Sequence, residues 1–332
     1  MKAMKEPSKL TPGLASFRTR FAPSPNGWLH LGHAYSAMLG AQLASEAGGT
    51  FLLRLEDIDI GRARPHFIDG IYQDLEWLGL EWQPPVLLQS TRFEAYEQAL
   101  KTLRDMDLVY PCWATRREIL DAIPDPATWP RDPDGAPLYP SLYRDLPDSE
   151  RKRRMWEGTS YAWRLDMKKA IAWVQKNISQ PLTYTEHNPM EGSPMEGSGP
   201  QTILTDPAAY GDVVLARKDV PTSYHLAVVV DDASQNITQV TRGRDLTPAT
   251  HIHRLLQALL GLATPDYFHH ELVRDTQGRR LSKTAGDNGF RELRQQGMSP
   301  EAVIALLPPP LGEGDILPPQ AASRDVSPMP KP

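Results

Sequence analysis

The sequence predicts an α/β protein with a doubly wound parallel sheet that is interrupted by an inserted α+β domain. Three observations predict this fold. Strand-like and helix-like segments alternate with short connections over residues 17–108, the same alternation returns after residue 203, and the stretch between them has a different texture. The 332 residues, of which 40% are hydrophobic, are enough to bury a core of this size.

The first half supplies two strands and three helices. Residues 17–21 alternate apolar and basic side chains, which predicts a short strand, and the apolar run 50–55 predicts a buried one. Residues 31–47 are rich in Ala and Leu and end at two glycines, as is typical of a helix. Apolar residues at helical spacing predict two more helices within 68–78 and 93–103.

The second half repeats the pattern. Residues 213–216 and 237–241 are predicted strands. Thr247 is a candidate helix cap with Pro248 at the first helical position, and the helix should end before Gly261. Strand, helix, strand, helix with short connections is typical of a Rossmann-type sheet.

Proline and a short repeat mark the irregular segments. The chain has 32 prolines, and they are concentrated near the C-terminus, while a pentapeptide occurs twice within 189–198. The predicted segments are an N-terminal extension (1–16), the first half of the Rossmann domain (17–108), an inserted domain (109–202) with a flexible stretch at 185–202, the second half (203–274), a loop and short helical region (275–307), and a Pro-rich disordered tail (308–332).

Composition excludes several classes of protein. One Cys excludes a disulfide framework and favours a reducing compartment, so a cytoplasmic location is expected. No apolar run approaches the ~18 residues of a membrane span, and no membrane partner is expected. A formal net charge of −5 argues against non-specific coating of nucleic acid but is compatible with a local basic groove.

Two histidines flank a glycine where the turn-rich stretch meets the first helix. His30 and His33 lie three residues apart, so they project from one face. The N-terminus of a helix favours phosphate, and Gly32 lets a base or sugar approach the backbone. The alternative is a structural pair of half-buried histidines.

A basic stretch near the C-terminus is a second candidate. Leu281, Ser282 and Lys283 lie in it, and a loop with a Lys and hydroxyls suits a pyrophosphate. For an isolated segment, a solvated basic loop is the alternative. The run 151–154 is likewise either a solvated helix face or a contact for RNA phosphates.

A third candidate group combines arginines with polar residues of both halves. Arg20 ends a predicted strand, where α/β sheets bind ligands. Arginine matches carboxylates in pairs of hydrogen bonds, so Arg20 and Arg242 suggest an acidic small molecule. Either could instead form a structural ion pair, for instance with the acidic run 56–59.

Taken together, these stretches resemble a known family. Residues 20–33, 53–59 and 281–283 resemble the first signature, the second strand and the KMSKS loop of the class I glutamyl-type aminoacyl-tRNA synthetases. They occur in the family's order and spacing, and the resemblance covers roughly residues 17–285. The fold it implies is the family's Rossmann-type catalytic domain.

The resemblance implies a two-step reaction. ATP, with Mg²⁺, and L-glutamate give glutamyl-adenylate and pyrophosphate, and the glutamyl group then passes to RNA. The implied catalytic residues are His30, His33 and Lys283. Those implied to bind ATP are His30, Gly32, His33, Leu281, Ser282 and Lys283, and those implied to hold glutamate are Arg20, Phe21, Ala22, Pro23, Ser24, Glu56, Tyr224 and Arg242. Such chemistry needs positioning and charge neutralisation, not a protein nucleophile.

Length points to one branch of the family. Only residues 284–332 follow Lys283, where full glutamyl-tRNA synthetases carry a large anticodon-binding region. The sequence therefore resembles the short glutamyl-Q branch, which activates glutamate without tRNA and esterifies it to queuosine in the anticodon loop of tRNA(Asp). The expected partners are L-glutamate and queuosine-bearing tRNA(Asp), and the expected state is a monomer. The alternatives are a truncated enzyme that charges tRNA(Glu), a small-molecule adenylyltransferase and a non-catalytic RNA-binding paralogue.

The sequence departs from that branch at its zinc site, which commonly uses three Cys and a Tyr. Cys112 and Tyr139 remain, but Ala114 and Tyr143 stand where further cysteines are expected. One thiolate with tyrosines cannot close a structural zinc site, so no zinc is expected. Aromatic packing around Trp113 is the hypothesis for what replaces it.

Overall fold

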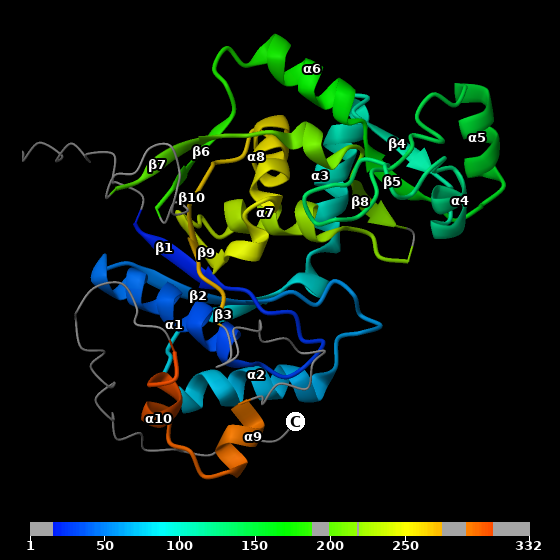
Figure 1. Cartoon of the computed structure of the whole chain (residues 1–332). Coiled ribbons are helices and arrows are strands. Elements are labelled where there is room, and N and C mark those ends of the chain that lie inside the picture. Colours follow the sequence, from blue (N-terminus) through cyan, green and yellow to red (C-terminus); the bar gives the residue numbers. More distant parts are fainter. Residues whose placement is uncertain (1–15, 188–198, 218, 274–289, 308–332) are drawn as a thin grey trace, which may run out of the picture.

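The computed structural model describes residues 16–187, 199–217, 219–273 and 290–307 (Figure 1). The pentapeptide repeat, the Lys283 loop, the tail from residue 308 and all but residue 16 of the N-terminal extension lie outside the described residues.

The first half of the sheet has three parallel strands in the order β1-β2-β3. These are β1 (Arg18–Phe21), β2 (Thr50–Leu55) and β3 (Gln83–Leu88). Helix α1 (Leu31–Glu46) joins β1 to β2, and α2 (Pro65–Trp77) joins β2 to β3. The predicted strands and the first two predicted helices are confirmed.

Strand β3 was not predicted because its second and third residues are Pro84 and Pro85. Proline cannot donate a ladder hydrogen bond and is confined to edges, ends or bulges of sheets. Strand β3 forms the edge of its sheet, and these prolines are exposed.

The second half has four strands in the order β7-β6-β10-β9. They are β6 (Thr183–Glu186), β7 (Gln201–Leu204), β9 (Gln239–Gly243) and β10 (Asp266–His270). Strand β10 pairs parallel with β9 and β6, and β7 is an antiparallel edge strand.

The two halves meet where β1 lies beside β9 (Figure 1). The backbone N–H of Thr238 donates to the carbonyl oxygen of Arg18 at 3.0 Å, and the N–H of Arg18 donates to Thr238 Oγ1 at 2.8 Å. The chain winds outwards from β1 through β2 to β3 and, on the other side, from β9 to β10. Doubly wound sheets bind ligands at the carboxyl ends of the strands at such a reversal of strand order.

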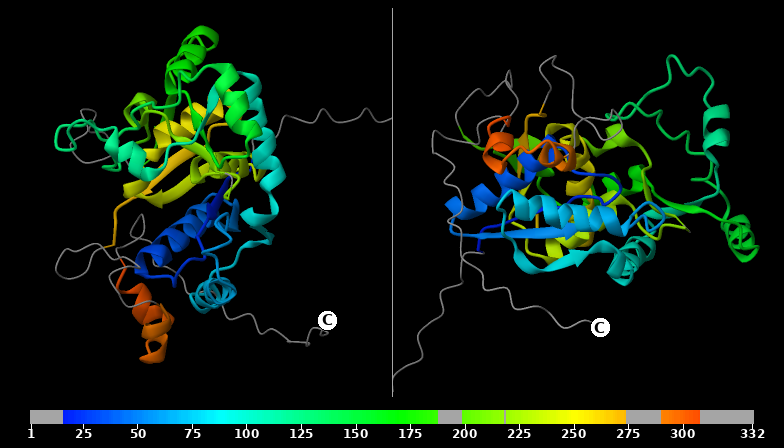
Figure 2. Two further views of the ribbon diagram at one scale, coloured as in Figure 1. Left: turned by 90° about the vertical axis from the view of Figure 1, so that its right-hand side faces the viewer. Right: turned by 90° about the horizontal axis from the view of Figure 1, so that it is seen from below.

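Helices cover both faces of this sheet (Figures 1 and 2). Helices α3 (Phe93–Asp105), α7 (Tyr224–Ser234) and α8 (Ala249–Leu260) lie on one face, and α1 and α2 lie on the other. Helices α1 and α2 pack against β1 and β2 in one buried apolar cluster, while α3, α7 and α8 share a second cluster with the strands of the inserted region. The apolar contacts of α1 and α2 therefore stabilise β1 and β2, whose ends help to form the pocket.

Two short helices extend the cluster on the α1 face. They are α9 (Phe290–Gln295) and α10 (Pro300–Ile304), which contribute the buried Phe290 and Val303. Among the helices of the described residues, none combines the length and apolar character that crossing a bilayer requires.

The start of α8 differs from the prediction. Helix α8 begins at Ala249, its N-cap is Pro248 without a side-chain bond, and Thr247 closes a preceding 3₁₀ turn. A proline N-terminal to a helix is compatible with either register, so the sequence alone did not fix the cap. The predicted end is confirmed, because Gly261 caps the helix with a left-handed φ of 64°.

The inserted region contains a second, antiparallel sheet of order β4-β5-β8. Its strands are β4 (Val109–Cys112), β5 (Ala162–Leu165) and β8 (Val214–Arg217). Helices α4 (Arg116–Asp121) and α5 (Asp148–Trp156) lie between β4 and β5. Figure 1 shows this lobe projecting from one end of the central sheet.

The two sheets interleave across the predicted boundary at residues 202 and 203. The predicted strand 213–216 exists as β8, but it completes the antiparallel sheet instead of the parallel one. Conversely, β6, within 109–202, belongs to the central sheet and follows α6 (Met167–Asn177). A short apolar run predicts a strand but carries no information about its partner.

Candidate active site

A pocket of about 460 Å³ opens where β1 and β9 meet. It draws on the ends of β1 and β9, the residue after β2, the start of α1 and the start of α7. The residues that line it are Arg20, Phe21, Ala22, Pro23, Ser24, Asn26, His30, Gly32, His33, Ser36, Glu56, Tyr224, Thr241, Arg242, Gly243, Asp245, Leu246, His270, Leu272 and Val273.

All the site residues predicted within the described part of the chain line this one pocket. Both histidines, Gly32 and every residue assigned to glutamate are among them. Leu281, Ser282 and Lys283 lie outside the described residues. Val273, the last described residue before that segment, lines the pocket, and the N–H of Phe290, the first after it, donates to the carbonyl oxygen of Leu29 at 3.2 Å, next to His30 in the chain.

His30 and His33 are held by the backbone that starts α1. His30 is the N-cap, and its Nδ1 accepts from the N–H of Gly32 at 3.1 Å. Nδ1 of His33 accepts from the N–H of His30, also at 3.1 Å. An Nδ1 that accepts places the proton of a neutral imidazole on Nε2. The two rings, with centroids 3.8 Å apart, are therefore N–H donors at a helix N-terminus.

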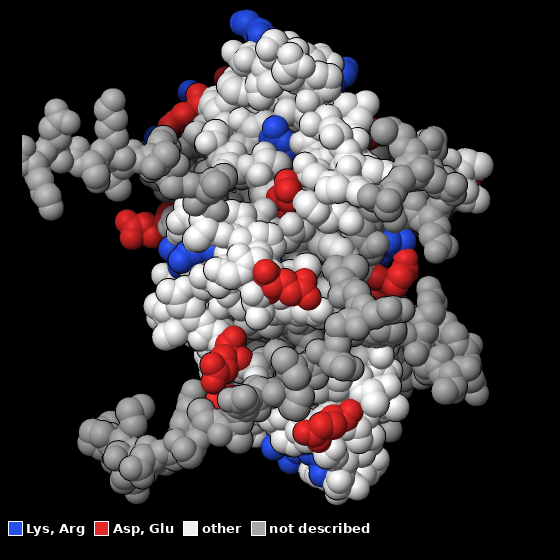
Figure 3. Space-filling model, turned by 90° about the vertical axis from the view of Figure 1, so that its left-hand side faces the viewer, with Lys and Arg blue, Asp and Glu red and all other residues white. Residues whose placement is uncertain are grey.

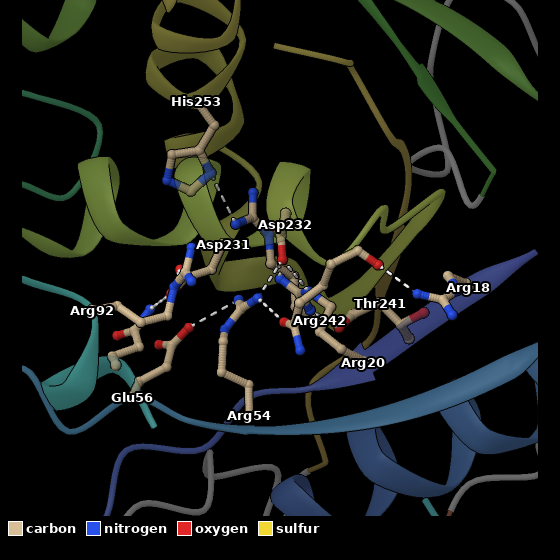
Figure 4. Close-up of polar contacts among 12 residues, drawn as sticks. Arg18, Arg20, Arg54, Glu56, Arg92, Asp231, Asp232, Thr241, Arg242 and His253 are labelled. Carbon is tan, nitrogen blue, oxygen red and sulfur yellow. Dashed lines mark hydrogen bonds and ion pairs between the residues drawn. The ribbon is translucent and has the colours of Figure 1, made fainter. Parts of the chain in front are cut away.

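Two buried arginines, Arg20 and Arg54, meet the carboxylates of Asp232 and Glu56 beside the pocket, and a third buried arginine lies near them (Figure 4). Nε of Arg20 donates to Asp232 Oδ1 at 2.9 Å, and Nη1 of Arg54 donates to the same oxygen at 2.7 Å. Nη2 of Arg54 also donates to Glu56 Oε1 at 3.3 Å. The third arginine, Arg242, contacts neither carboxylate through a hydrogen bond within the described residues.

The pKa values of these two carboxylates shift in opposite directions. Burial alone would raise the pKa of Asp232, but Arg20 and Arg54 outweigh it and hold the pKa below its usual value. Burial raises the pKa of Glu56, and Arg54 and Arg20 only partly oppose it. Glu56 is therefore the carboxylate whose ionised form gains most from an additional cation.

The alternative role for Arg20, a structural ion pair, is found in the structure but with another partner. Arg20 does form a buried ion pair, but its partner is Asp232 and not the acidic run 56–59. Of that run, Asp57 accepts from the N–H and hydroxyl of Ser90 at 2.8 and 2.6 Å. The partner of Arg20 could not be read from the sequence because Asp232 is distant in the chain.

Several residues at the site were missed by sequence reasoning. Ser36 Oγ and His270 Nε2 lie 2.6 Å apart in the pocket wall, and His270 Nδ1 lies 2.8 Å from the carbonyl oxygen of Glu271. Arg54 and Asp232 are the buried ion pair behind it. An Arg within a buried strand, as at position 54, was the one signal available, since such a charge requires a partner.

The remnant of the zinc motif forms a compact polar and aromatic cluster. Cys112 Sγ lies 3.2 Å from the hydroxyl of Tyr139, over whose ring Arg164 stacks at 3.8 Å. The rings of Trp113 and Tyr143 have centroids 5.8 Å apart. Within the described ranges there is no group of three or more His, Cys, Asp or Glu side chains placed to hold a metal ion.

The basic run in α5 is largely engaged within its own helix. Nε of Arg154 and Nη2 of Arg153 each donate to Glu150 at 2.6 Å. These contacts fit the solvated helix face. On the face in Figure 3, acidic and basic side chains both form small separate patches among uncharged residues.

The fold and the pocket define the catalytic domain of a class I aminoacyl-tRNA synthetase. Residues 16–308 match the family model described as tRNA synthetases class I (E and Q), catalytic domain. The chain belongs to this family, and it is a ligase that uses ATP.

Two glutamyl-Q tRNA(Asp) synthetases are similar to this chain over most of its length. The chain is 43% identical over 294 residues to a glutamyl-Q tRNA(Asp) synthetase of Rhodobacter capsulatus, covering 87% of this chain and 99% of that protein. It is 40% identical to the glutamyl-Q tRNA(Asp) synthetase of Nocardia farcinica, covering 88% and 84%.

Full-length glutamate enzymes match over a smaller share of their length. The chain is 35% identical to glutamate–tRNA ligase 1 of Roseobacter denitrificans, covering 87% of this chain but 60% of that protein. A crystal structure of the glutamate–tRNA synthetase from Elizabethkingia anophelis superposes with a TM-score of 0.66 at 26% identity, again over 87% of this chain and 60% of the other.

Proposed function

We propose that this enzyme activates L-glutamate with ATP in the absence of tRNA and transfers the glutamyl group to queuosine in the anticodon loop of tRNA(Asp). The observation that carries the proposal is the charge at the reversal point of the sheet. Arg20 and Arg54 there share the carboxylate of Asp232, whereas the buried guanidinium of Arg242 is hydrogen-bonded to uncharged acceptors within the described residues and can receive an anionic ligand. L-Glutamate, with two carboxylates and one ammonium group, carries the complementary charge.

The two ends of the pocket suit the two ends of the amino acid. Glu56 provides a carboxylate for the ammonium group, and Arg242 provides a guanidinium for a carboxylate. Arg20 is already paired with Asp232, so its proposed role is to shape the pocket beside the ligand and not to neutralise it alone. The backbone from Phe21 to Ser24 lines the wall between them.

The start of α1 suits the triphosphate. The Nε2–H groups of His30 and His33 and the first N–H groups of α1 place partial positive charge there. Gly32 keeps this approach open: a Cβ at that position would lie 3.1 Å from the His30 ring. Mg²⁺ is expected to come with ATP, since it is commonly held through substrate phosphates and does not need an all-protein cage.

In the activation step a carboxylate oxygen of glutamate attacks the α-phosphorus of ATP, and pyrophosphate leaves with the bonding electrons of the broken P–O bond. Lys283, together with the two histidines, is proposed to stabilise the charge that develops on pyrophosphate. In the second step a hydroxyl oxygen of queuosine attacks the activated carbonyl carbon, the bond from that carbon to the phosphate oxygen breaks so that AMP leaves, and the hydroxyl proton passes to AMP or to solvent. No protein nucleophile is needed, because positioning and charge stabilisation suffice.

The similarity to known enzymes supports queuosine in tRNA(Asp) as the proposed acceptor of the glutamyl group. The two glutamyl-Q enzymes are more similar to this chain than the glutamate–tRNA ligase is, at 43% and 40% against 35% identity. The competing candidate is a glutamate–tRNA ligase activity, which the 35% relative favours.

Two assays test the proposal. Glutamate-dependent ATP–pyrophosphate exchange without tRNA is expected, and its absence would overturn tRNA-independent activation. Labelled glutamate is expected to pass to tRNA(Asp) that carries queuosine and not to the same tRNA without it. Labelling of the 3′ end of tRNA(Glu) would instead establish the competing activity. A monomeric enzyme in a reducing compartment such as the cytoplasm is part of the proposal.

A further inference from the structure

Arg242 differs from Arg20 and Arg54 in what surrounds it. Arg20 and Arg54 each donate to the carboxylate of Asp232. Arg242 is only 5% exposed, yet within the described residues its hydrogen-bond partners are four uncharged acceptors. These are Tyr224 Oη at 3.2 Å, Thr250 Oγ1 at 2.7 Å, His253 Nδ1 at 3.2 Å and His269 Nε2 at 3.1 Å.

The His269 ring is oriented by a carboxylate on its far side. Nδ1 of His269 lies 2.5 Å from Glu186 Oε2, and the backbone N–H of His269 donates to Oε1 of the same residue at 3.1 Å. A carboxylate at Nδ1 fixes the ring proton there and leaves Nε2 as the acceptor for Arg242. Glu186 therefore acts on the guanidinium through a neutral ring and does not contact it.

The His253 ring is oriented in the same sense by a second histidine. If Nδ1 of His253 accepts from Arg242, the proton of the neutral ring is on Nε2, which lies 3.2 Å from Nδ1 of His225. Arg242 then donates to His253, and His253 donates to His225, so that neither ring donates a proton towards the guanidinium. Burial and the Arg242 charge lower the pKa of His225 to about 4 and, for His253, well below the usual value.

His269 is also uncharged, as its role as an acceptor for Arg242 requires. Burial lowers its pKa to about 4 and Arg242 acts in the same direction, which outweighs the opposing effect of Glu186. The three imidazoles are therefore neutral near pH 7. A buried cation without a directly bound anion costs free energy that a bound anion recovers.

We infer that His253 and His269 are positioning residues that hold Arg242 through uncharged acceptors, so that its charge stays available for a carboxylate of the substrate. The inference rests on the proposed function, in which that substrate is glutamate. It goes beyond that proposal by assigning a role to residues behind the pocket wall: because the acceptors that hold Arg242 in the described part of the chain are uncharged, its guanidinium keeps its charge for an anion.

Two substitutions at position 253 test this role. In His253→Asp, a carboxylate oxygen takes the place of Nδ1, satisfies Arg242 and neutralises it. In His253→Asn, an uncharged oxygen takes that place. Loss of a charge-assisted hydrogen bond to substrate corresponds to about 10- to 100-fold in affinity. His253→Asp should raise KM for glutamate by that factor in the exchange assay with KM for ATP unchanged, and His253→Asn should stay within about threefold of wild type.

A second position keeps the test decisive if His253→Asp does not fold. Thr250 lies in the first turn of α8, where a carboxylate is favoured by the helix dipole. Thr250→Asp should raise KM for glutamate like His253→Asp, and Thr250→Ser should not. His251, on the same helix, accepts from the N–H of Asp206 at 2.9 Å and does not line the pocket. His251→Asp is therefore the matched control and should leave KM for glutamate unchanged.

Calorimetric titration of L-glutamate separates the two ways in which the inference can fail. A wild-type protein that binds no glutamate would overturn the proposed function and this inference with it. A wild type that binds glutamate, with both aspartate variants binding equally well, would overturn the inference alone. It is also overturned if His253→Asn weakens binding as much as His253→Asp, because the loss would then come from packing of the ring and not from charge.

Discussion

Arg20 and Asp232 are joined by two hydrogen bonds although they lie 212 positions apart: Nε donates to Oδ1 at 2.9 Å and Nη2 donates to Oδ2 at 3.4 Å. The pair connects the end of β1 to α7, and Arg54 of β2 adds a third bond to the same carboxylate. The ion pair therefore fixes the two halves of the doubly wound sheet to each other where the pocket opens.

Asp232→Ala should destabilise the protein by about 3–5 kcal/mol, since it leaves two buried arginines with less than their neutralising charge. The measurement is chemical denaturation at pH 7. Asp105→Ala is the matched control, because its ion pair with Lys101 is exposed, and it should change stability by less than about 1 kcal/mol. Equal effects of the two substitutions would contradict the structural role of Asp232.

His30→Asn and His30→Ala separate the capping role of His30 from its proposed catalytic role. Asparagine keeps an N-cap acceptor but lacks an N–H at the position of Nε2. Both variants should lower kcat for pyrophosphate exchange by about 10²–10³, the usual loss for one transition-state donor. Only His30→Ala should also lower stability, by about 1 kcal/mol. Full exchange activity in His30→Asn would exclude the proposed contact with ATP phosphates.

Asp74 is expected to make the free energy of unfolding depend on pH. It is 2% exposed on α2, and Arg294 Nη1 of α9 donates to it at 3.0 Å. Burial raises its pKa from 3.8 to about 6, with Arg294 opposing only in part. Because the folded-state pKa is the higher one, this group favours folding below about pH 4, and that contribution is lost as pH rises through about 6.

Asp74→Asn should therefore stabilise the protein more at pH 7.5 than at pH 4, by up to about 3 kcal/mol for a pKa raised from 3.8 to about 6. Urea denaturation of both proteins at the two pH values provides the comparison, in which groups common to both cancel. The same difference between variant and wild type at both pH values would show that Asp74 titrates normally.

The cluster around Cys112 should be independent of metal. Chelators should leave the melting temperature unchanged, and purified protein should contain no stoichiometric zinc; finding zinc by elemental analysis would overturn this. Tyr143→Ala should unfold the inserted lobe, because it removes the ring against Trp113 and beneath Arg154, whose guanidinium lies 5.4 Å from the ring centre. A Tyr143→Ala variant with an intact lobe by near-UV circular dichroism would show that the aromatic contacts are not what holds it.

Neutralising the run 151–154 tests the remaining RNA contact. The variant should bind tRNA more weakly and with a shallower dependence on salt if these residues touch phosphates. Unchanged affinity at every salt concentration would leave the run as the solvated helix face that the Glu150 contacts indicate.

The sequence by itself determined most of the local structure and identified part of the pocket lining, although β3, Ser36 and His270 were missed. Period-two and helical spacing predicted β1, α1 and β2, and Gly261 predicted the end of α8, because these signals depend on neighbours within a few residues. The residues proposed for ATP and glutamate in the described part of the chain all line one pocket, since strand ends at a reversal point converge in space.

Tertiary structure alone decided which groups meet across long stretches of chain. It gave Arg20 the carboxylate of Asp232 in place of the nearby acidic run, placed β8 in the antiparallel sheet, and surrounded Arg242 with His253 and His269. None of these pairings produces a periodic pattern in the sequence from which it could be predicted. They follow from burial, since a charge or strand edge removed from water takes whichever partner the packed helices and sheets bring within reach.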